Sequence, residues 1–423
     1  MSAVGFKVLV AIATAVLGAA VFRSRLPDTL SQARFLWLAA SLQLIPVCAL
    51  FLGIYVIGRE QVSSDVPGYY LPAARAVAEG KLPFRDFATS YAPLFPYVSA
   101  ALVRVWDSGK VFALFAMMMN MLGLIAWHRA AASLCNEATA RRGTILYASS
   151  GHIAIQALLG SNQCWIAAAL GWSVFLTARD RGTASGLIQC LAVCTTKFLT
   201  LLFWPVLWVC AQRRRLWILA AALPASLVYG FFVFAGGSVF EPLRRESPRT
   251  TSGNLAYLLE PLLPAAAASN HHVVDAVALL ALGGSAVWLF IRALPLPAAQ
   301  RPRLLLPGLV LLGIVFMLFS KKSYTGYAVF FLYPATSVLV SGVRSLRGGC
   351  AFFLLFNVLL VSEPSLWFQM GGYGRALSSW LKSAADRAPD EFVLLDACLI
   401  ACYVFIAWLS VQCLRQSRTA PSN

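Results

Sequence analysis

Charged residues are scarce in this chain. Asp, Glu, Lys and Arg make up only 12% of its 423 residues, whereas they make up about a quarter of an ordinary globular protein. Hydrophobic residues make up 59%, and the mean hydropathy is +0.73. This composition excludes a soluble globular fold and predicts an all-α polytopic membrane protein. Internal repeats, low-complexity tracts and segments typical of a soluble domain are also lacking, so we expect one membrane domain over residues 1–423.

Acidic residues are fewer than basic ones, 17 against 34, which gives a net charge of +17. Such a charge is also found in nucleic-acid-binding proteins. Here, however, the basic residues occur in short clusters between apolar runs, which is typical of the loops of a membrane protein. We therefore expect membrane lipids as partners and no nucleic acid.

Metal-ligand motifs are absent from the sequence. The ten cysteines lie mostly within apolar runs and none of them forms a CxxC pair, so we interpret them as small hydrophobic residues. The four histidines have no ligand spacing with acids. We expect no metal and no cofactor.

Apolar runs dominate the rest of the chain, although some are short for the roughly 20 residues that cross a bilayer. Each should be helical, because lipid cannot bond exposed backbone groups and nothing alternates like a barrel strand. We expect about 11–13 transmembrane helices, the first of them retained because it lacks the clear basic leading region of a signal peptide. The candidate spans are residues 3–22, 35–57, 111–129, 144–160, 163–178, 183–196, 198–211, 216–236, 272–292, 304–320, 324–343, 350–362 and 391–413.

The loops divide into two groups by charge. One group holds 18 basic residues against three acids, and the positive-inside rule makes that face cytoplasmic. The other face carries long loops at residues 58–110, 237–271 and 363–390, the first containing juxtamembrane helices. This requires that Pro93–Trp106 lies along the membrane or dips into it without crossing. We expect an integral protein of a bacterial inner or plasma membrane, with its active site on the extracytoplasmic side.

The first of these long loops holds two carboxylates, several basic residues and a run of Tyr and Pro. An apolar helix is followed by Asp65, then by Tyr69 and Tyr70 with an Ala-rich amphipathic segment, then by Pro83–Phe87 and Tyr91–Leu94. This order resembles the first external loop of the GT-C superfamily of integral-membrane glycosyltransferases.

A second stretch extends the resemblance. Gly160–Gln163 precedes a pair of apolar runs that contains Lys197 and ends before Arg213–Arg215, which is similar to the polyprenol-phosphate-mannose-dependent mannosyltransferase branch. The resemblance implies a GT-C-like fold and transfer of a sugar, mannose or another hexose or pentose, from a polyprenyl-phosphate donor to a lipid-linked or envelope glycan acceptor. It also implies that Asp65 is the catalytic base.

The chemistry of Asp65 is consistent with that role. It follows the end of a span, where a carboxylate can be ionised and can accept a hydroxyl proton as the sugar is displaced. The alternative is that Asp65 only caps the next helix. One base and a good phosphate leaving group favour a single inverting displacement. Asp86 either contacts substrate or forms a local ion pair with Arg85.

Lysines within apolar stretches are the other candidates. A Lys at the centre of a span costs about 2.5 to 3.5 kcal/mol, so Lys197 indicates a function at the tip of a helical hairpin, with snorkelling as the alternative. Lys321 and Lys322 interrupt another apolar region, where anchoring of a helix end is the alternative. We assign Lys197, Lys321, Lys322, Arg75 and Arg85 to the donor phosphate, and Asp86, Tyr69, Tyr70, Tyr91, Asn162, Gln163 and Glu363 to the substrates.

Two other classes of function remain open. A transporter or flippase of lipid-linked glycans should have paired charges or broken helices at the bilayer midplane in two corresponding halves. The sequence has Lys197 but no second-half partner. A membrane-embedded acyltransferase should have a His-centred motif within a span, and His152 alone does not supply one.

Overall fold

Helices form nearly all the regular structure of the chain. The computed structural model describes residues 3–63, 65–242, 251–259, 271–343, 345–369 and 390–416. Within these ranges the β-structure is limited to an isolated bridge between Pro83 and Phe87. The all-α class expected from the sequence is therefore confirmed.

Seven of the described helices are long and apolar enough to cross a membrane. Five shorter apolar helices accompany them within the same ranges. Two of these, Gly182–Thr195 and Phe198–Cys210, form a hairpin. The span-length segments are α1 (Ala3–Arg23), α3 (Gln32–Leu50) with the π-helix η1 (Phe51–Ile57), α6 (Lys110–Leu134), α12 (Arg214–Phe234), α16 (His271–Ala293), α17 (Leu305–Phe319) preceded by η5 (Arg301–Leu304), and α20 (Asp390–Gln416). The other elements near expected spans are α9 (Gln163–Ala178), η6 (Thr325–Ala328), α18 (Val329–Gly342) and α19 (Leu346–Gln369), with short α2 (Leu26–Thr29) and α14 (Leu255–Leu259) between longer ones.

The single span expected over residues 144–160 is wrong. The chain instead forms α7 (Glu137–Ala148) and α8 (Gly151–Leu158), which are separated at two buried serines. The Ser150 hydroxyl donates to the Asn357 side chain, and Gly151 lies so close to α1 that a Cβ there would be 2.3 Å from the Ala11 Cβ. Polar pairing and close backbone packing thus override the apolar run.

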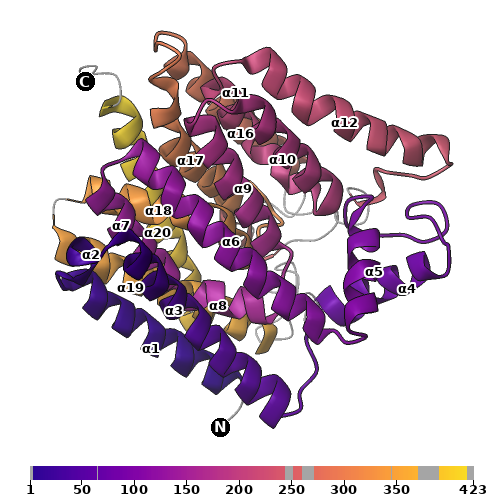
Figure 1. Cartoon of the computed structure of the whole chain (residues 1–423), viewed down its shortest axis with the longest axis horizontal. Coiled ribbons are helices and arrows are strands. Elements are labelled where there is room, and N and C mark those ends of the chain that lie inside the picture. Colours follow the sequence, from indigo (N-terminus) through magenta and orange to yellow (C-terminus); the bar gives the residue numbers. More distant parts are fainter. Residues whose placement is uncertain are drawn as a thin grey trace.

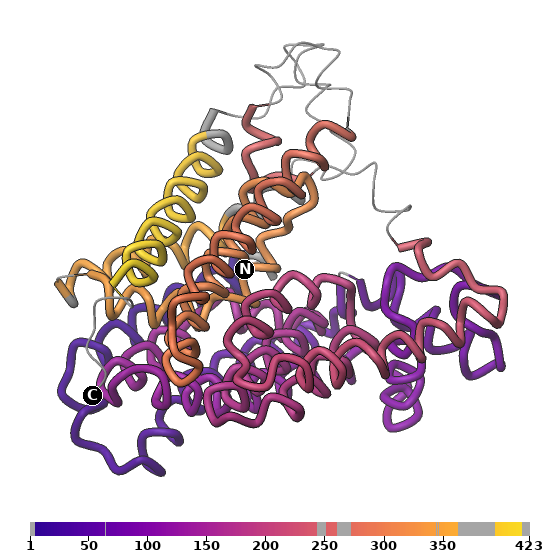
Figure 2. The backbone as a smooth tube through the Cα atoms, turned by 90° about the horizontal axis from the view of Figure 1, so that it is seen from above, coloured from indigo at the N-terminus to yellow at the C-terminus, as the bar shows by residue number. Residues whose placement is uncertain are grey.

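The amphipathic part of the first long loop forms two short helices, α4 (Leu71–Ala78) and α5 (Phe95–Val105), which pack against each other. With 11 residues, α5 is only about 16 Å long and cannot cross about 30 Å of hydrocarbon, as expected for Pro93–Trp106. Figure 1 shows α4 and α5 together on the right of the bundle, with α2 and α7 on the left. Figure 2 shows the same first-half helices beneath the later helices of the chain.

A short hairpin faces this part of the fold. It consists of α10 (Gly182–Thr195), the 3-10 turn η3 (Phe198–Phe203) and α11 (Trp204–Cys210). Lys197 lies between its two arms. Because α10 has 14 residues, it rises only about 21 Å from the arginine-rich end of the bundle, so the tip falls short of a full membrane crossing.

Candidate active site

Asp65 stands between two π-helical segments. The chain leaves α3 through η1, crosses to Asp65 and enters the π-helix η2 (Val66–Tyr70), which continues into α4. Val66 is buried against the start of α6, where a Cβ on Gly109 would be 3.0 Å from it. Short π segments are rare and often occur at functional sites. The Asp65 side chain is 37% exposed, so it is anchored through Val66 while its carboxylate remains accessible.

Tyr91 provides a hydrogen-bond donor to this carboxylate. Its hydroxyl donates to Asp65 Oδ2 at 2.5 Å. Burial and the neighbouring Tyr70 and Asp65 raise the pKa of Tyr91 well above its usual value, so the phenol keeps its proton. The Tyr91 ring stacks on Phe95 with a centroid distance of 4.4 Å.

Backbone hydrogen bonds connect the Tyr91 segment to the hairpin. The Ala92 amide donates to the Thr196 carbonyl at 3.0 Å, and the Leu94 amide donates to the Cys194 carbonyl at 2.9 Å. These carbonyls lie at the end of α10, directly before Lys197. The first loop and the hairpin therefore meet in a defined register beside Asp65.

Lys197 completes the centre of the site. Its ammonium lies 3.9 Å from Asp65 Oδ2, and its side chain is 15% exposed. The same nitrogen stands 4.7 Å from the centroid of the Tyr91 ring and 5.7 Å from that of Tyr327, which is within cation–π range. A carboxylate, a phenol and an ammonium from three distant segments thus share one site.

The two lysines after α17 have different environments. Burial and the Lys197 ammonium lower the pKa of Lys322 to about 7, while Asp65 opposes this shift. The charges of Lys197 and Asp65 therefore both act on Lys322. Lys321 instead pairs with Asp275 of α16 at 2.7 Å, and its side chain is only 5% exposed. Its ammonium is thus engaged at the neighbouring helix.

The tyrosines and amides assigned to the substrates form the wall behind Asp65. Tyr70 is buried, with its ring centroid 5.1 Å from that of Tyr91, and its hydroxyl accepts from the Asn162 backbone amide at 3.3 Å. The ring centroid of Tyr69 lies 6.3 Å from that of Tyr91. Asn162 is fully buried, and the Gln163 side-chain carbonyl accepts from the Ser161 hydroxyl. Tyr69 is thus the more exposed of the two tyrosines, while Tyr70 and Asn162 act as support.

Three residues of the first loop form ion pairs with each other or with a neighbour. Arg85 bonds both Asp86 oxygens at 2.8 Å. That guanidinium and the Leu82 amide lower the pKa of Asp86 to about 2. Arg75 lies 3.9 Å from Asp107, and both of these side chains are exposed. The described contacts of these residues connect none of them to Asp65.

The Glu363 side chain lies outside the part of the chain that the structure describes. Among the described residues, no three His, Cys, Asp or Glu side chains gather where they could hold a metal ion. Metal independence therefore stays a prediction.

Two residues that contribute to this environment were not identified from the sequence. Tyr327 offers its ring to Lys197, and its position three residues after Tyr324 and shortly after two lysines was the available signal. Asp275 pairs with Lys321, and an acid inside the apolar run 272–292 could have indicated such a partner.

The arrangement can accept a proton and hold an anion at adjacent points. Asp65 is a partly exposed carboxylate oriented by Tyr91, and it can act as a general base. Lys197 and Lys322 can place positive charge beside a departing phosphate.

The chain was compared with known proteins in three ways. No family model matches it, and no curated protein matches it in sequence. Among solved structures it is similar to ArnT from Cupriavidus metallidurans, whose crystal structure contains undecaprenyl phosphate. The two chains are 14% identical, the match covers 89% of this chain and 78% of that chain, and the TM-score is 0.46.

Proposed function

We propose that the protein is an inverting glycosyltransferase that moves a sugar, mannose or another hexose or pentose, from a polyprenyl-phosphate donor to a hydroxyl of a lipid-linked or envelope glycan. The observation that carries the proposal is the grouping of the Asp65 carboxylate with the Tyr91 hydroxyl at 2.5 Å and the Lys197 ammonium at 3.9 Å. One carboxylate beside cationic side chains suits a single displacement at the anomeric carbon.

Asp65 acts as general base in this reaction. The acceptor oxygen attacks the anomeric carbon and its proton passes to the Asp65 carboxylate. The bond between the anomeric carbon and the phosphate oxygen breaks, and its electron pair leaves with the polyprenyl phosphate. Tyr91 keeps its own proton because burial raises its pKa, so it holds the carboxylate in place and does not compete for the transferred proton.

Lys197 and Lys322 stabilise the leaving group. Charge develops on the phosphate as the bond breaks, and fixed positive charge in a partly buried site stabilises it far more than water would. Lys197 is largely buried and Lys322 is half-buried. Lys321 contributes through its bond to Asp275, which holds the segment after α17 against α16.

The depth of the site suits a lipid-linked donor. The Lys197 tip follows a helix that rises about 21 Å, whereas the hydrocarbon core is about 30 Å thick. The ammonium therefore stands below the membrane surface on the face opposite the arginine clusters. A phosphate attached to a membrane-embedded polyprenyl chain can reach this level.

The test is sugar transfer by Asp65→Asn. Purified protein would receive radiolabelled polyprenyl-phosphate mannose, with envelope membranes from cells lacking this chain as the source of acceptor. Loss of the base should lower the transfer rate by about 10²-fold or more. Glu79→Gln is the matched control, because Glu79 is an exposed acid of the same loop whose ion pair, among the described residues, is with Lys81. Transfer by Asp65→Asn at the wild-type rate would overturn the assignment.

A further inference from the structure

A second site lies at the other end of the bundle. A cavity of about 610 Å³ opens where α3 begins and where α6 and α9 end. This volume is within the roughly 300 to 1,000 Å³ of small-molecule pockets. The cavity is lined by Gln32, His128, Arg129, Ala132, Ser133, Phe175, Ala178 and Arg179.

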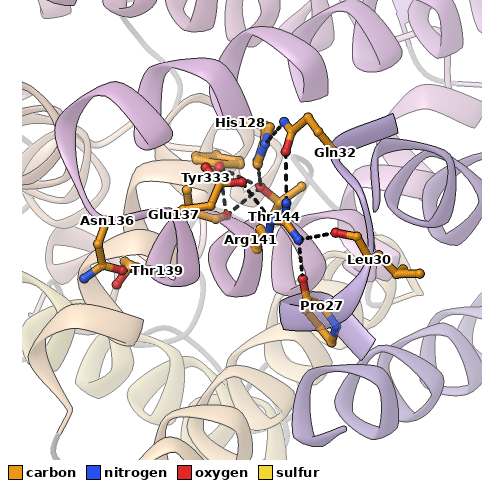
Figure 3. A network of polar contacts seen from close by, with 11 residues as sticks. Pro27, Leu30, Gln32, His128, Asn136, Glu137, Thr139, Arg141, Thr144 and Tyr333 are labelled. Atoms are coloured by element: carbon orange, nitrogen blue, oxygen red, sulfur yellow. Dashed lines mark hydrogen bonds and ion pairs between the residues drawn. The ribbon is translucent and has the colours of Figure 1, made fainter. Parts of the chain in front are cut away.

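Two of the lining residues, Gln32 and His128, belong to a network of polar contacts behind the cavity (Figure 3). The Gln32 side-chain nitrogen lies 2.7 Å from His128 Nε2, and His128 Nδ1 lies 3.0 Å from the Thr144 hydroxyl. Arg141 donates to the Gln32 carbonyl at 3.3 Å and to the Leu30 backbone carbonyl at 2.7 Å. These partners determine the tautomer of His128. The Gln32 side-chain nitrogen can only donate, so His128 accepts at Nε2 and donates from Nδ1.

In this arrangement the His128 ring is neutral, and the charge of Arg141 is balanced by Glu137, whose carboxylate lies 2.7 Å from the guanidinium. Thr144 passes the hydrogen-bond chain on to the Ala140 carbonyl at 2.7 Å. His128 and Thr144 are both fully buried. The hydrogen bond between Gln32 and His128 connects the start of α3 to α6. It therefore holds the two helices, and the cavity beside them, in one arrangement.

The mouth of the cavity is positively charged. Arg129 and Arg179 are exposed, and within the described ranges neither forms an ion pair with an acid. The Arg179 guanidinium stands 5.7 Å from the centroid of the Phe175 ring, which leaves its edge available to a ligand. Ala132, Phe175 and Ala178 add apolar surface to the same lining. The lining therefore combines two guanidinium forks with apolar surface.

We infer that this cavity binds the headgroup of an anionic phospholipid. Guanidinium groups bind phosphate oxygens in pairs, and the apolar surface can receive the first carbons of the acyl chains. Basic pockets between helices at an arginine-rich membrane face are suited to such headgroups. The ligand class is a phosphodiester that carries a net negative charge.

This site is separate from the Asp65 site. Helix α9 lies between Asn162, behind Tyr70, and Arg179 at the cavity, and its 16 residues give a rise of about 24 Å. Binding at the two sites can therefore be measured independently.

The experiment is binding of a short-chain phosphatidylglycerol to the full chain in a neutral detergent. Phosphatidylcholine of equal chain length and inorganic phosphate serve as competing probes. We expect phosphatidylglycerol to bind at least tenfold more tightly than either. The double variant R129Q/R179Q should weaken its binding by roughly tenfold or more, whereas R213Q/R215Q removes two exposed arginines elsewhere on this face and should change it by less than twofold.

Ala132→Trp tests the cavity without changing charge. The indole would occupy part of the cavity that Ala132 lines, so phosphatidylglycerol binding should be lost while the melting temperature and gel-filtration profile stay close to wild type. Wild-type affinity in Ala132→Trp would overturn the inference. Equal losses in both arginine pairs would also contradict it, because they would indicate general surface attraction, and tighter binding of inorganic phosphate would assign the cavity to a soluble anion.

Discussion

Lys322 is a titratable group at the candidate site with a strongly lowered pKa. Burial and the Lys197 ammonium lower its pKa to about 7. Its ammonium is present below that pH and is lost as the pH rises. Above that pH, Lys322 must take up a proton before its ammonium can bind the donor phosphate in the proposed reaction. We therefore expect the affinity for the donor to fall as the solution becomes more alkaline.

We therefore predict a pH-dependent kcat/KM for the donor that declines above pH 7, by on the order of tenfold between pH 7 and 8.5. Lys322→Arg should remove this decline, because a guanidinium stays charged across the range. The measurement is kcat/KM for polyprenyl-phosphate mannose from pH 6 to 9 in both proteins. An unchanged alkaline limb in Lys322→Arg would assign the pH dependence to another group.

Single site residues were predictable where an ionisable side chain lies in an apolar stretch, because placing its charge there costs free energy. Lys197 interrupts an apolar stretch, and the structure brings it to Asp65. Lys321 and Lys322 are adjacent and equally conspicuous in the sequence, yet Lys321 pairs with Asp275 while the charges of Lys197 and Asp65 act on Lys322. Such a choice depends on how α16 and α17 pack, which hydropathy does not encode.

At the scale of elements, the turn between α8 and α9 packs against the residue that follows Asp65. Gly160 has a φ of +68°, which L side chains rarely adopt. A Cβ there would stand 2.9 Å from the Phe112 Cβ and 3.1 Å from Val66 Cγ2. Because Val66 follows Asp65 directly, any displacement of this turn is transmitted to the carboxylate.

Gly160→Ala should lower the free energy of unfolding by about 2 kcal/mol through backbone strain and overlap, and it should lower the transfer rate as well. Gly230→Ala in α12 is the control, because no atom lies within 4 Å of its ideal Cβ, and alanine favours the helix. Thermal unfolding and transfer rate would be compared for both. A Gly160→Ala protein with wild-type stability would show that the turn is not constrained as described.

Most element positions follow from hydropathy because lipid requires every spanning segment to be an apolar helix. The exceptions have local causes. The division of residues 144–160 into two helices depends on Ser150 reaching Asn357 in a distant segment. The exclusion of α5 from the spans was predictable, since its length falls short of the bilayer.

At the scale of the whole molecule, the fold separates two kinds of chemistry. The Asp65 site lies at one end of the bundle, and the arginine clusters with the cavity of α6 and α9 lie at the other. The grouping of basic loops was predictable from charge alone. The meeting of Asp65, Tyr91 and Lys197 was not, because it depends on the backbone bonds from Ala92 and Leu94 to the end of α10.

The separation of the Asp65 site from the arginine clusters predicts that the two face opposite sides of the membrane. An epitope inserted after Gly80, in the exposed turn that follows α4, should be reached by an antibody added to intact spheroplasts. An epitope inserted between Gln212 and Arg213 should be reached only after permeabilisation. Detection of both epitopes from the same side would contradict the orientation and, with it, an extracytoplasmic transfer reaction.

The π-helix η2 has a consequence for the length of the chain at this point. A π turn holds one residue more than an α turn, so Val66–Tyr70 contains a residue that an α-helix would not use. An ideal Cβ at Gly68 would have no atom of another segment within 4 Å, so tertiary packing does not restrict this position. If these five residues adopted α geometry with none removed, the residues after them would rotate by about the 100° that one further α residue adds, which would turn the Tyr70 ring away from Tyr91. The π geometry of Val66–Tyr70 therefore sets where Tyr69 and Tyr70 stand relative to Asp65, and a change that restored α geometry at unchanged chain length would act on the site as a substitution does.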